Sequence, residues 1–148
     1  TTKGAVFNVD SAGNYNLTYD LLFGDADWTS FETLSFRACQ ATRHPLTTGI
    51  LGDGRFEIEL VDNSGNASVL SILVTGAGVV EPYQRTGCGT GLPGWGNEFE
   101  TFRIPLEGFT AEDANFDLSN IDKLIFRFGA AHGSAMGRYG LDDIELTK

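Results

Sequence analysis

A glycine-rich stretch near the middle of the chain holds residues suited to binding chemistry. Residues 86–99 read TGCGTGLPGWGNEF and place a thiol, Cys88, and a large indole, Trp95, among five glycines. A loose loop orients an indole only if something tethers the loop. Cys39 is the other cysteine of the chain, so we predict a Cys39–Cys88 disulfide in an oxidising compartment. The alternative is a pair of free thiols.

Further candidates for binding lie in other irregular segments. Tyr83 follows a proline, and its ring and the Trp95 indole present flat apolar faces. Arg43, His44 and His132 offer N–H donors for hydroxyl groups. The two histidines lack the HxH or HExxH spacing of a transition-metal site, so a solvated loop role is the plainer interpretation. The segment HGSAMG (132–137) only approximates a nucleophile elbow and predicts no catalytic serine.

Two neighbouring acids interrupt the last apolar pattern of the chain. Leu141 and Ile144 are three residues apart, so they cannot share one face of a regular strand. A β-bulge at Asp142 and Asp143 would return both apolar residues to the core and re-aim the carboxylates. Paired carboxylates for glycoside hydrolysis remain an alternative use of the acids, but no pair is singled out.

The elements that must position these residues are strands. Apolar and polar residues alternate with period two, and no segment of useful length shows helical periodicity; residues 110–120 form one helical turn at most. The alternating segments are 15–23, 33–40, 55–62, 69–76, 99–109, 122–129 and 138–147. Asn/Asp/Gly clusters at 10–14 and 62–66 predict turns. We predict one all-β domain over 1–148, a jelly-roll sandwich of about eight strands.

Strand direction predicts which loops meet. If successive strands alternate in direction, the loops 41–54, 77–97 and 130–137 all lie at one edge of the sandwich, which we call the loop edge. That edge carries every binding candidate named above. Trp28 lies at the opposite end and is expected to cap the core there.

Charged residues occupy the outward positions of the predicted strands: Arg37, Glu57, Glu59, Arg103 and Arg127. A cross-strand charge ladder is the plain interpretation. A polysaccharide cleft on a sheet face is the alternative, but the pattern places no aromatic residue among these charges.

The net charge of −10 limits the partners. A phosphate backbone or an anionic membrane would be repelled, so we expect no nucleic-acid partner and no membrane insertion. The apolar run 67–80 is too short and too broken by glycine to span a bilayer. The chain starts at Thr1, and we expect a monomeric domain processed or excised from a larger secreted or cell-surface protein.

Four segments together resemble a known group of domains: LSFRACQ, FRIPLEGF, DLSNIDKLIFRFG and YGLDDIEL. They resemble the carbohydrate-binding modules, and their galactose-binding-like relatives, that are appended to secreted bacterial hydrolases. The resemblance covers roughly residues 15–146 and implies a jelly-roll fold. It also implies that a carboxylate of the closing LDDI, Asp142 or Asp143, holds a structural calcium. Calcium takes six to eight oxygen ligands, so acids such as Asp10 or Asp20 would have to join them.

These observations favour a non-catalytic module that binds an oligosaccharide or polysaccharide at the loop edge. Trp95 and Tyr83 would stack on sugar rings, while Arg43, His44 and His132 would supply polar contacts. One alternative is a structural or adhesive accessory domain without a sugar site. Another is a glycoside or ester hydrolase.

Overall fold

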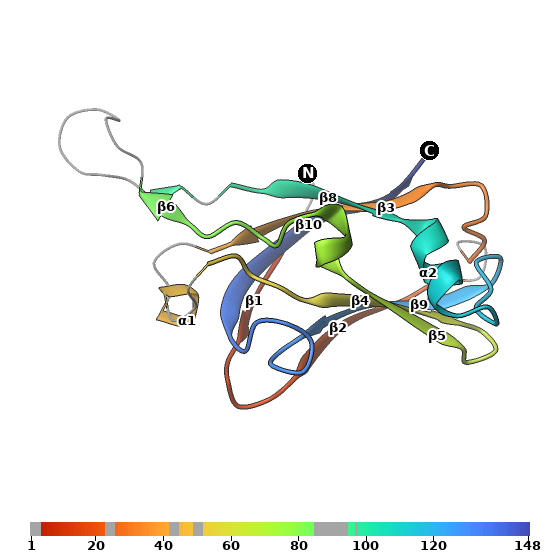
Figure 1. Ribbon diagram of the computed structural model, residues 1–148, viewed down its shortest axis with the longest axis horizontal. Helices are drawn as coiled ribbons and strands as arrows, with labels where there is room; N and C mark the ends of the chain where they lie inside the picture. Colours follow the sequence, from red (N-terminus) through yellow and green to blue (C-terminus); the bar gives the residue numbers. More distant parts are fainter. Residues whose placement is uncertain (1–3, 23–25, 42–44, 49–51, 85–94, 97) are drawn as a thin grey trace.

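Two antiparallel sheets face each other across a single core in the computed structural model, which describes residues 4–22, 26–41, 45–48, 52–84, 95–96 and 98–148, with the backbone alone at 47–48, 84 and 95–96 (Figure 1). In spatial order, sheet A contains β1 (Ala5–Val9), β10 (Gly137–Thr147), β3 (Thr33–Gln40) and β8 (Glu100–Pro105). Sheet B contains β2 (Tyr15–Asp20), β9 (Ile121–Phe128), β4 (Glu57–Asp62) and β5 (Ala67–Ser71). The predicted all-β sandwich is confirmed.

Short elements extend the two sheets. A two-stranded hairpin joins β6 (Tyr83–Gln84) to β7 (Trp95–Gly96). The helical elements are α1 (Pro45–Thr48), the 3₁₀ turn η1 (Ile72–Thr75) and α2 (Leu106–Glu112). Among the described residues, none of the helices has the length and apolar character needed to cross a membrane.

Helix α2 was not predicted: the limit of one helical turn concerned residues 110–120, of which only 110–112 belong to the helix. The predicted strand 99–109 ends at Pro105, and seven residues of helix follow. Leu106 and Phe109 are both buried, which is the three-residue spacing of a helix face. Glu107 in the first turn also favours the helix N-terminus. The predicted strand 69–76 likewise ends early, at Ser71, whose side chain accepts a hydrogen bond from the N–H of Leu73 and caps η1.

Aromatic side chains from both sheets fill the core. Phe36 of β3 and Phe126 of β9 meet edge to face, with ring centroids 5.2 Å apart. Phe56 precedes β4, and its ring centroid lies 4.8 Å from that of Phe128, with the two ring planes tilted by 44°. Trp28 is buried with this core at the end away from the loop edge, as predicted.

The predicted bulge in the last strand is present. The register of β10 against β3 shifts between Asp142 and Glu145, and Asp143 has a φ of 48°. Leu141 is buried and Ile144 packs against the core. The bulge therefore directs the side chains of both apolar residues toward the core, as their spacing required.

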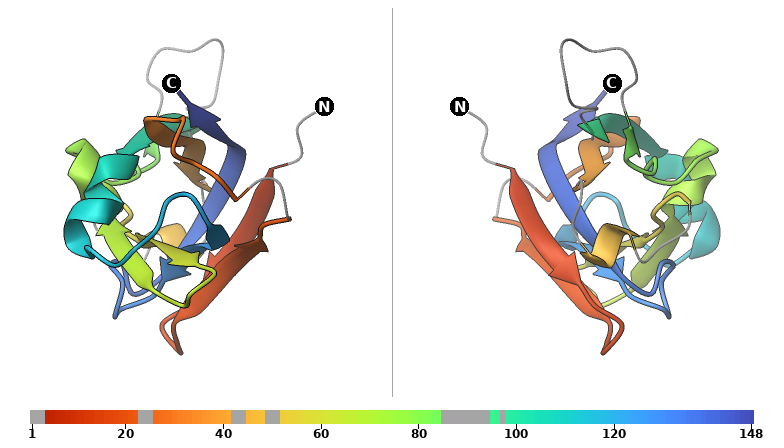
Figure 2. Two further views of the ribbon diagram at one scale, coloured as in Figure 1. Left: turned by 90° about the vertical axis from the view of Figure 1, so that its right-hand side faces the viewer. Right: turned by 90° about the vertical axis from the view of Figure 1, so that its left-hand side faces the viewer.

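The charge ladder divides between the two sheets. On sheet B, Arg127 pairs with Glu59 at 3.1 Å, which confirms a cross-strand charge pair. Arg37 lies on sheet A, where its guanidinium is 3.4 Å from the Asp143 carboxylate. Figure 2 shows the two sheets end-on, as separate layers of the sandwich.

Candidate functional site

The predicted convergence of loops is confirmed for the segments that the structure describes. Gly54 and Val79 exchange two backbone hydrogen bonds of 2.7 and 2.8 Å between two of the loops. The third loop joins through Ser134, whose N–H donates to the carbonyl of Arg55 at 3.0 Å. Gln40, at the end of β3, donates its side-chain N–H to the Val79 carbonyl at 2.8 Å. These segments make up the loop edge, which lies toward the left-hand side of the molecule in Figure 1.

The backbone at Gly54 packs tightly against the ring of Tyr139 in β10, and this contact supports the loop edge. Tyr139 is fully buried, and a Cβ built on Gly54 would lie 2.6 Å from its ring. Only glycine therefore allows the loop after α1 to approach β10 this closely. Burial raises the pKa of the Tyr139 phenol, so this group is neutral at physiological pH.

Tyr83 lines a small hollow on the loop edge. Its side chain is 45% exposed, and its hydroxyl donates to Glu98 at 2.6 Å. The hollow has a volume of about 180 Å³ and is lined by Val80, Glu81, Pro82, Tyr83, Glu98 and Glu100. This volume is smaller than the ~300–1,000 Å³ of pockets that enclose a ligand. The hollow can therefore hold one face of a ring rather than surround it.

Acidic side chains fix the backbone of this hollow. Glu100 accepts a hydrogen bond from the N–H of Val80 at 2.9 Å. Asp53, from the neighbouring loop, accepts one from the N–H of Glu81 at 3.3 Å. The segment that carries Tyr83 is thus held on both sides before any ligand arrives.

Several predicted residues of the loop edge lie outside the described residues. Arg43, His44 and Cys88 belong to this group, so the Cys39–Cys88 disulfide stays a prediction. Trp95 is described through its backbone, which pairs with Gln84 in the β6–β7 hairpin. The hairpin therefore brings the backbones of Tyr83 and Trp95 to adjacent strands.

His132 does not line the hollow and instead contacts residues of sheet B. Its Nδ1 lies 2.8 Å from a carboxylate oxygen of Glu57, and its Nε2 lies 3.5 Å from Nη2 of Arg127. Its side chain is only 12% exposed, so the plain interpretation of a solvated loop residue was wrong. The partner could not be foreseen locally, because Glu57 is 75 residues away.

Sequence reasoning missed an aromatic residue on the outer face of sheet A. Phe99 is 36% exposed, and its ring centroid is 5.2 Å from Cζ of Arg37, a cation–π contact. A Cβ on Gly140 would lie 3.2 Å from the Phe99 ring, which places the ring over β10. Phe99 precedes the buried Phe102 by three positions, and this odd spacing was the available signal for the outer face.

The carboxylates of Asp142 and Asp143 have partners within the protein, and a structural calcium at this position stays a prediction. Asp142 accepts the N–H of Asp143 at 2.9 Å, and Asp143 pairs with Arg37. Asp10 follows Val9, and Val9 pairs with Gly137, so this acid lies beyond the other end of β1. No group of three or more His, Cys, Asp or Glu side chains suited to a metal occurs within the described residues.

The hydroxyl of Ser134 has a structural partner. It accepts the N–H of Arg55 at 2.9 Å and so closes the loop edge. His132 faces Glu57 instead. This arrangement gives no support to a serine–histidine catalytic pair.

Comparisons with known proteins identify the fold. Neither a protein-family model nor a curated protein matches the chain. Among solved structures, the chain is similar to a family 11 carbohydrate-binding module from Clostridium thermocellum in complex with a β-1,3-1,4-mixed-linked tetrasaccharide. The TM-score is 0.55, and the sequence identity is 16% over 99% of this chain and 83% of that one. The chain is also similar to the family 11 module of the cellulosomal cellulase Lic26A-Cel5E of the same organism, with a TM-score of 0.53 and 18% identity over 99% and 82%. The chain therefore has a jelly-roll fold like that of carbohydrate-binding modules, as its sequence resemblance implied.

Proposed function

We propose that this chain is a non-catalytic module that binds a neutral oligosaccharide or polysaccharide at its loop edge. The observation that carries the proposal is an exposed tyrosine, Tyr83, held by Glu98 in a small preformed hollow of a fold shared with carbohydrate-binding modules. One of those modules was solved with a tetrasaccharide bound.

The chemistry of the hollow suits one sugar ring. The flat face of Tyr83 matches the C–H face of a pyranose, and neighbouring carboxylates accept hydrogen bonds from sugar hydroxyls. Trp95 would add a second stacking surface from the adjacent strand, and Arg43 and His44 would donate hydrogen bonds. His132 is left to its partner Glu57.

Charge defines the class of sugar. The hollow contains three glutamates, and the whole chain has a net charge of −10. Acidic polysaccharides would be repelled by this field, so the proposed ligand is a neutral glycan. Glu98 and Glu100 each accept a hydrogen bond from the protein itself, which favours binding over hydrolysis as their use.

We place the module outside the cell, where the Cys39–Cys88 disulfide would tether the glycine-rich loop. A ring of this size contributes about 4 kcal/mol in the chain-entropy model. Thiol titration of the unfolded protein, before and after reduction, tests the bond. Two reactive thiols before reduction would contradict it. Calcium at Asp142 or Asp143 also stays a prediction, and no step of sugar binding depends on it.

Affinity electrophoresis and tryptophan fluorescence against a panel of soluble glycans test the function. The panel contains mixed-linked β-glucan, xylan, mannan and the acidic polygalacturonate. We expect saturable binding to a neutral glycan, weakened about three- to tenfold in Tyr83→Ala, in line with ~0.5–1.5 kcal/mol for an aromatic contact. Trp95→Ala tests the second stacking residue.

Tyr19→Ala is the matched control, because Tyr19 is a partly exposed tyrosine on β2, at the end of that strand away from the loop edge. It should bind the glycan like the wild type. Equal binding by Tyr83→Ala and the wild type would remove the loop edge as the site. No binding to any member of the panel would favour a structural or adhesive module.

A further inference from the structure

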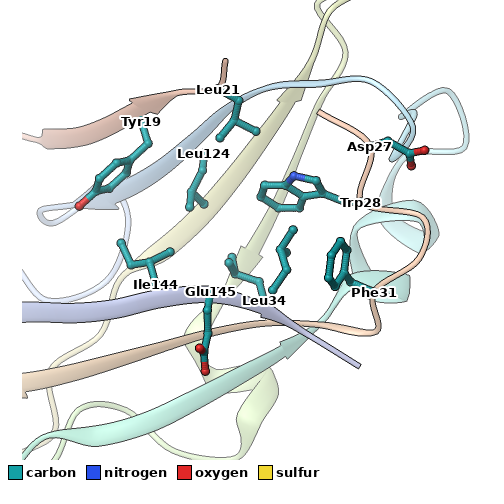
Figure 3. Close-up of a pocket in the computed structure, with 10 residues that line it drawn as sticks. Tyr19, Leu21, Asp27, Trp28, Phe31, Leu34, Leu124, Ile144 and Glu145 are labelled. Atoms are coloured by element: carbon teal, nitrogen blue, oxygen red, sulfur yellow. The ribbon is translucent and has the colours of Figure 1, made fainter. Parts of the chain in front are cut away.

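A larger hollow lies between the two sheets, at the end of the sandwich opposite the loop edge. Its volume is about 560 Å³, within the ~300–1,000 Å³ typical of small-molecule pockets. We call it the interlayer pocket; the side chains that define it are Tyr19, Trp28, Phe31, Leu34, Leu124 and Ile144 (Figure 3). None of these residues belongs to the proposed sugar site.

The pocket exists because one strand is short. β1 pairs with β10 only from Gly137 to Leu141, so it does not reach the second half of β10. There the bulge returns Ile144 to the inner face, where it remains only partly covered. Tyr19, on edge strand β2, is 36% exposed across the gap. Apolar inner faces of both sheets therefore line an open space.

The aromatic wall of the pocket is fixed in place. The backbone N–H of Trp28 donates to the Leu118 carbonyl at 2.9 Å, and the N–H of Phe31 donates to the Trp28 carbonyl at 3.0 Å. In Figure 3, Trp28 and Phe31 lie at one end of the pocket and Tyr19 lies at the other. Leu34 and Leu124 supply aliphatic surface between them. A flat apolar ring suits this preformed space.

Acidic side chains contribute to the lining of the pocket. Among the described residues that line it, Asp27 and Glu145 carry a charge, and both are exposed. Hydrogen bonds from the Thr29 side chain and backbone lower the pKa of the Asp27 carboxyl, so it is ionised at neutral pH. With a net charge of −10 on the chain, this field disfavours an anionic ligand such as a fatty acid.

We propose that the interlayer pocket binds a small aromatic molecule that carries no negative charge. The size of the space, its aromatic and aliphatic walls and its acidic surroundings together point to this class. The site is independent of sugar binding, because it uses different residues at the other end of the molecule.

Three probes that share one ring test the proposal: benzyl alcohol, benzyltrimethylammonium and benzoate. In a Trp95→Phe variant, Trp28 is the sole tryptophan, and its indole N–H signal in a ¹H–¹⁵N NMR spectrum reports on the pocket. We expect saturable shifts with the neutral and cationic probes and at least about fivefold weaker binding of benzoate. Replacing both Asp27→Asn and Glu145→Gln should reduce the preference for the cation about threefold.

Ile144→Phe fills the pocket and should weaken the neutral probe at least about tenfold, while glycan binding at the loop edge is unchanged. Leu73→Phe is the control, because it adds the same ring at a partly exposed leucine of η1 outside the pocket. Contacts between the probe and the methyl groups of Leu124 and Ile144, measured by nuclear Overhauser effects in the wild type, provide a test that needs no variant. Absence of those contacts, or equal affinity for all three probes, would overturn the proposal.

Discussion

Asp62 is a buried carboxylate that holds together two turns at one end of the molecule. Its side chain is buried, and its two oxygens accept hydrogen bonds from the N–H groups of Ser64, Asn66 and Asp117 and from the Asn66 side chain, at 2.9 to 3.2 Å. The carboxylate therefore joins the β4–β5 turn to the loop after α2.

The pKa of Asp62 makes this junction sensitive to acid. Burial alone would raise that pKa, but the hydrogen bonds from Asn66 and the backbone outweigh it and hold the pKa below its ordinary value. A carboxyl whose pKa is lower in the folded state stabilises the fold above its unfolded pKa of about 3.9, and this stability is lost as the pH falls through the folded value.

We therefore expect Asp62→Asn to cost about 2–4 kcal/mol at pH 7, because an amide cannot accept all four hydrogen bonds. Urea unfolding from pH 7 to pH 2 measures the effect. The difference between wild type and variant should shrink below about pH 4. A difference that stays constant down to pH 2 would show that Asp62 does not titrate as described.

Residue-scale features divide into those visible in the sequence and those that depend on distant partners. The outward position of Arg127 followed from the alternation of its strand, and Tyr83 was a binding candidate because of its residue type and its place in a loop. The contact between His132 and Glu57 required the register of β9 against β4, and the place of Phe99 required the course of β10 beneath it. Neither could be read from a short segment.

At the scale of elements, the bulge in β10 has a testable backbone requirement. Asp143 adopts a left-handed φ of 48°, which a β-branched residue tolerates poorly. Asp143→Val should lower the free energy of unfolding by about 1–2 kcal/mol more than Asp143→Asn does. Both variants lose the ion pair with Arg37, so the difference isolates the backbone. Equal stabilities in chemical denaturation would contradict this account.

The prediction of elements succeeded where apolar and polar residues alternate over many positions, and it failed where an element is short. The alternation in 33–40 and 122–129 predicted β3 and β9, and the spacing of Leu141 and Ile144 predicted the bulge. α2 was missed because Leu106 and Phe109 give only one helical interval, next to Pro105. β1 was missed because five residues carry too little pattern.

At the scale of the whole molecule, the alternating direction of successive strands predicted that three loops meet at the loop edge. This prediction needs only the number and direction of strands. The same information could not predict the interlayer pocket, because that space depends on how far β1 extends along β10. The pairing of strands decides where a sheet is incomplete, and a single sequence does not show which strands pair.

Removal of divalent cations tests the remaining prediction at this scale. A calcium ion that binds the folded state at Asp142 or Asp143 stabilises that state, so we expect EDTA to lower the melting temperature by more than about 2 °C. Differential scanning calorimetry with added calcium or EDTA measures this. The decrease should disappear in Asp142→Asn or Asp143→Asn. A smaller change, with Arg37 as the partner of Asp143, would contradict the calcium site implied by the sequence resemblance.

The direction of β10 has a practical consequence. This strand begins at Gly137 beside the loop edge and runs eleven residues, about 35 Å, toward the other end of the sandwich. The C-terminus therefore lies away from Tyr83 (Figure 1). A sensor surface or bead attached at Lys148 would hold the molecule with its loops turned toward the solution, so that long polymers can reach them without meeting the support.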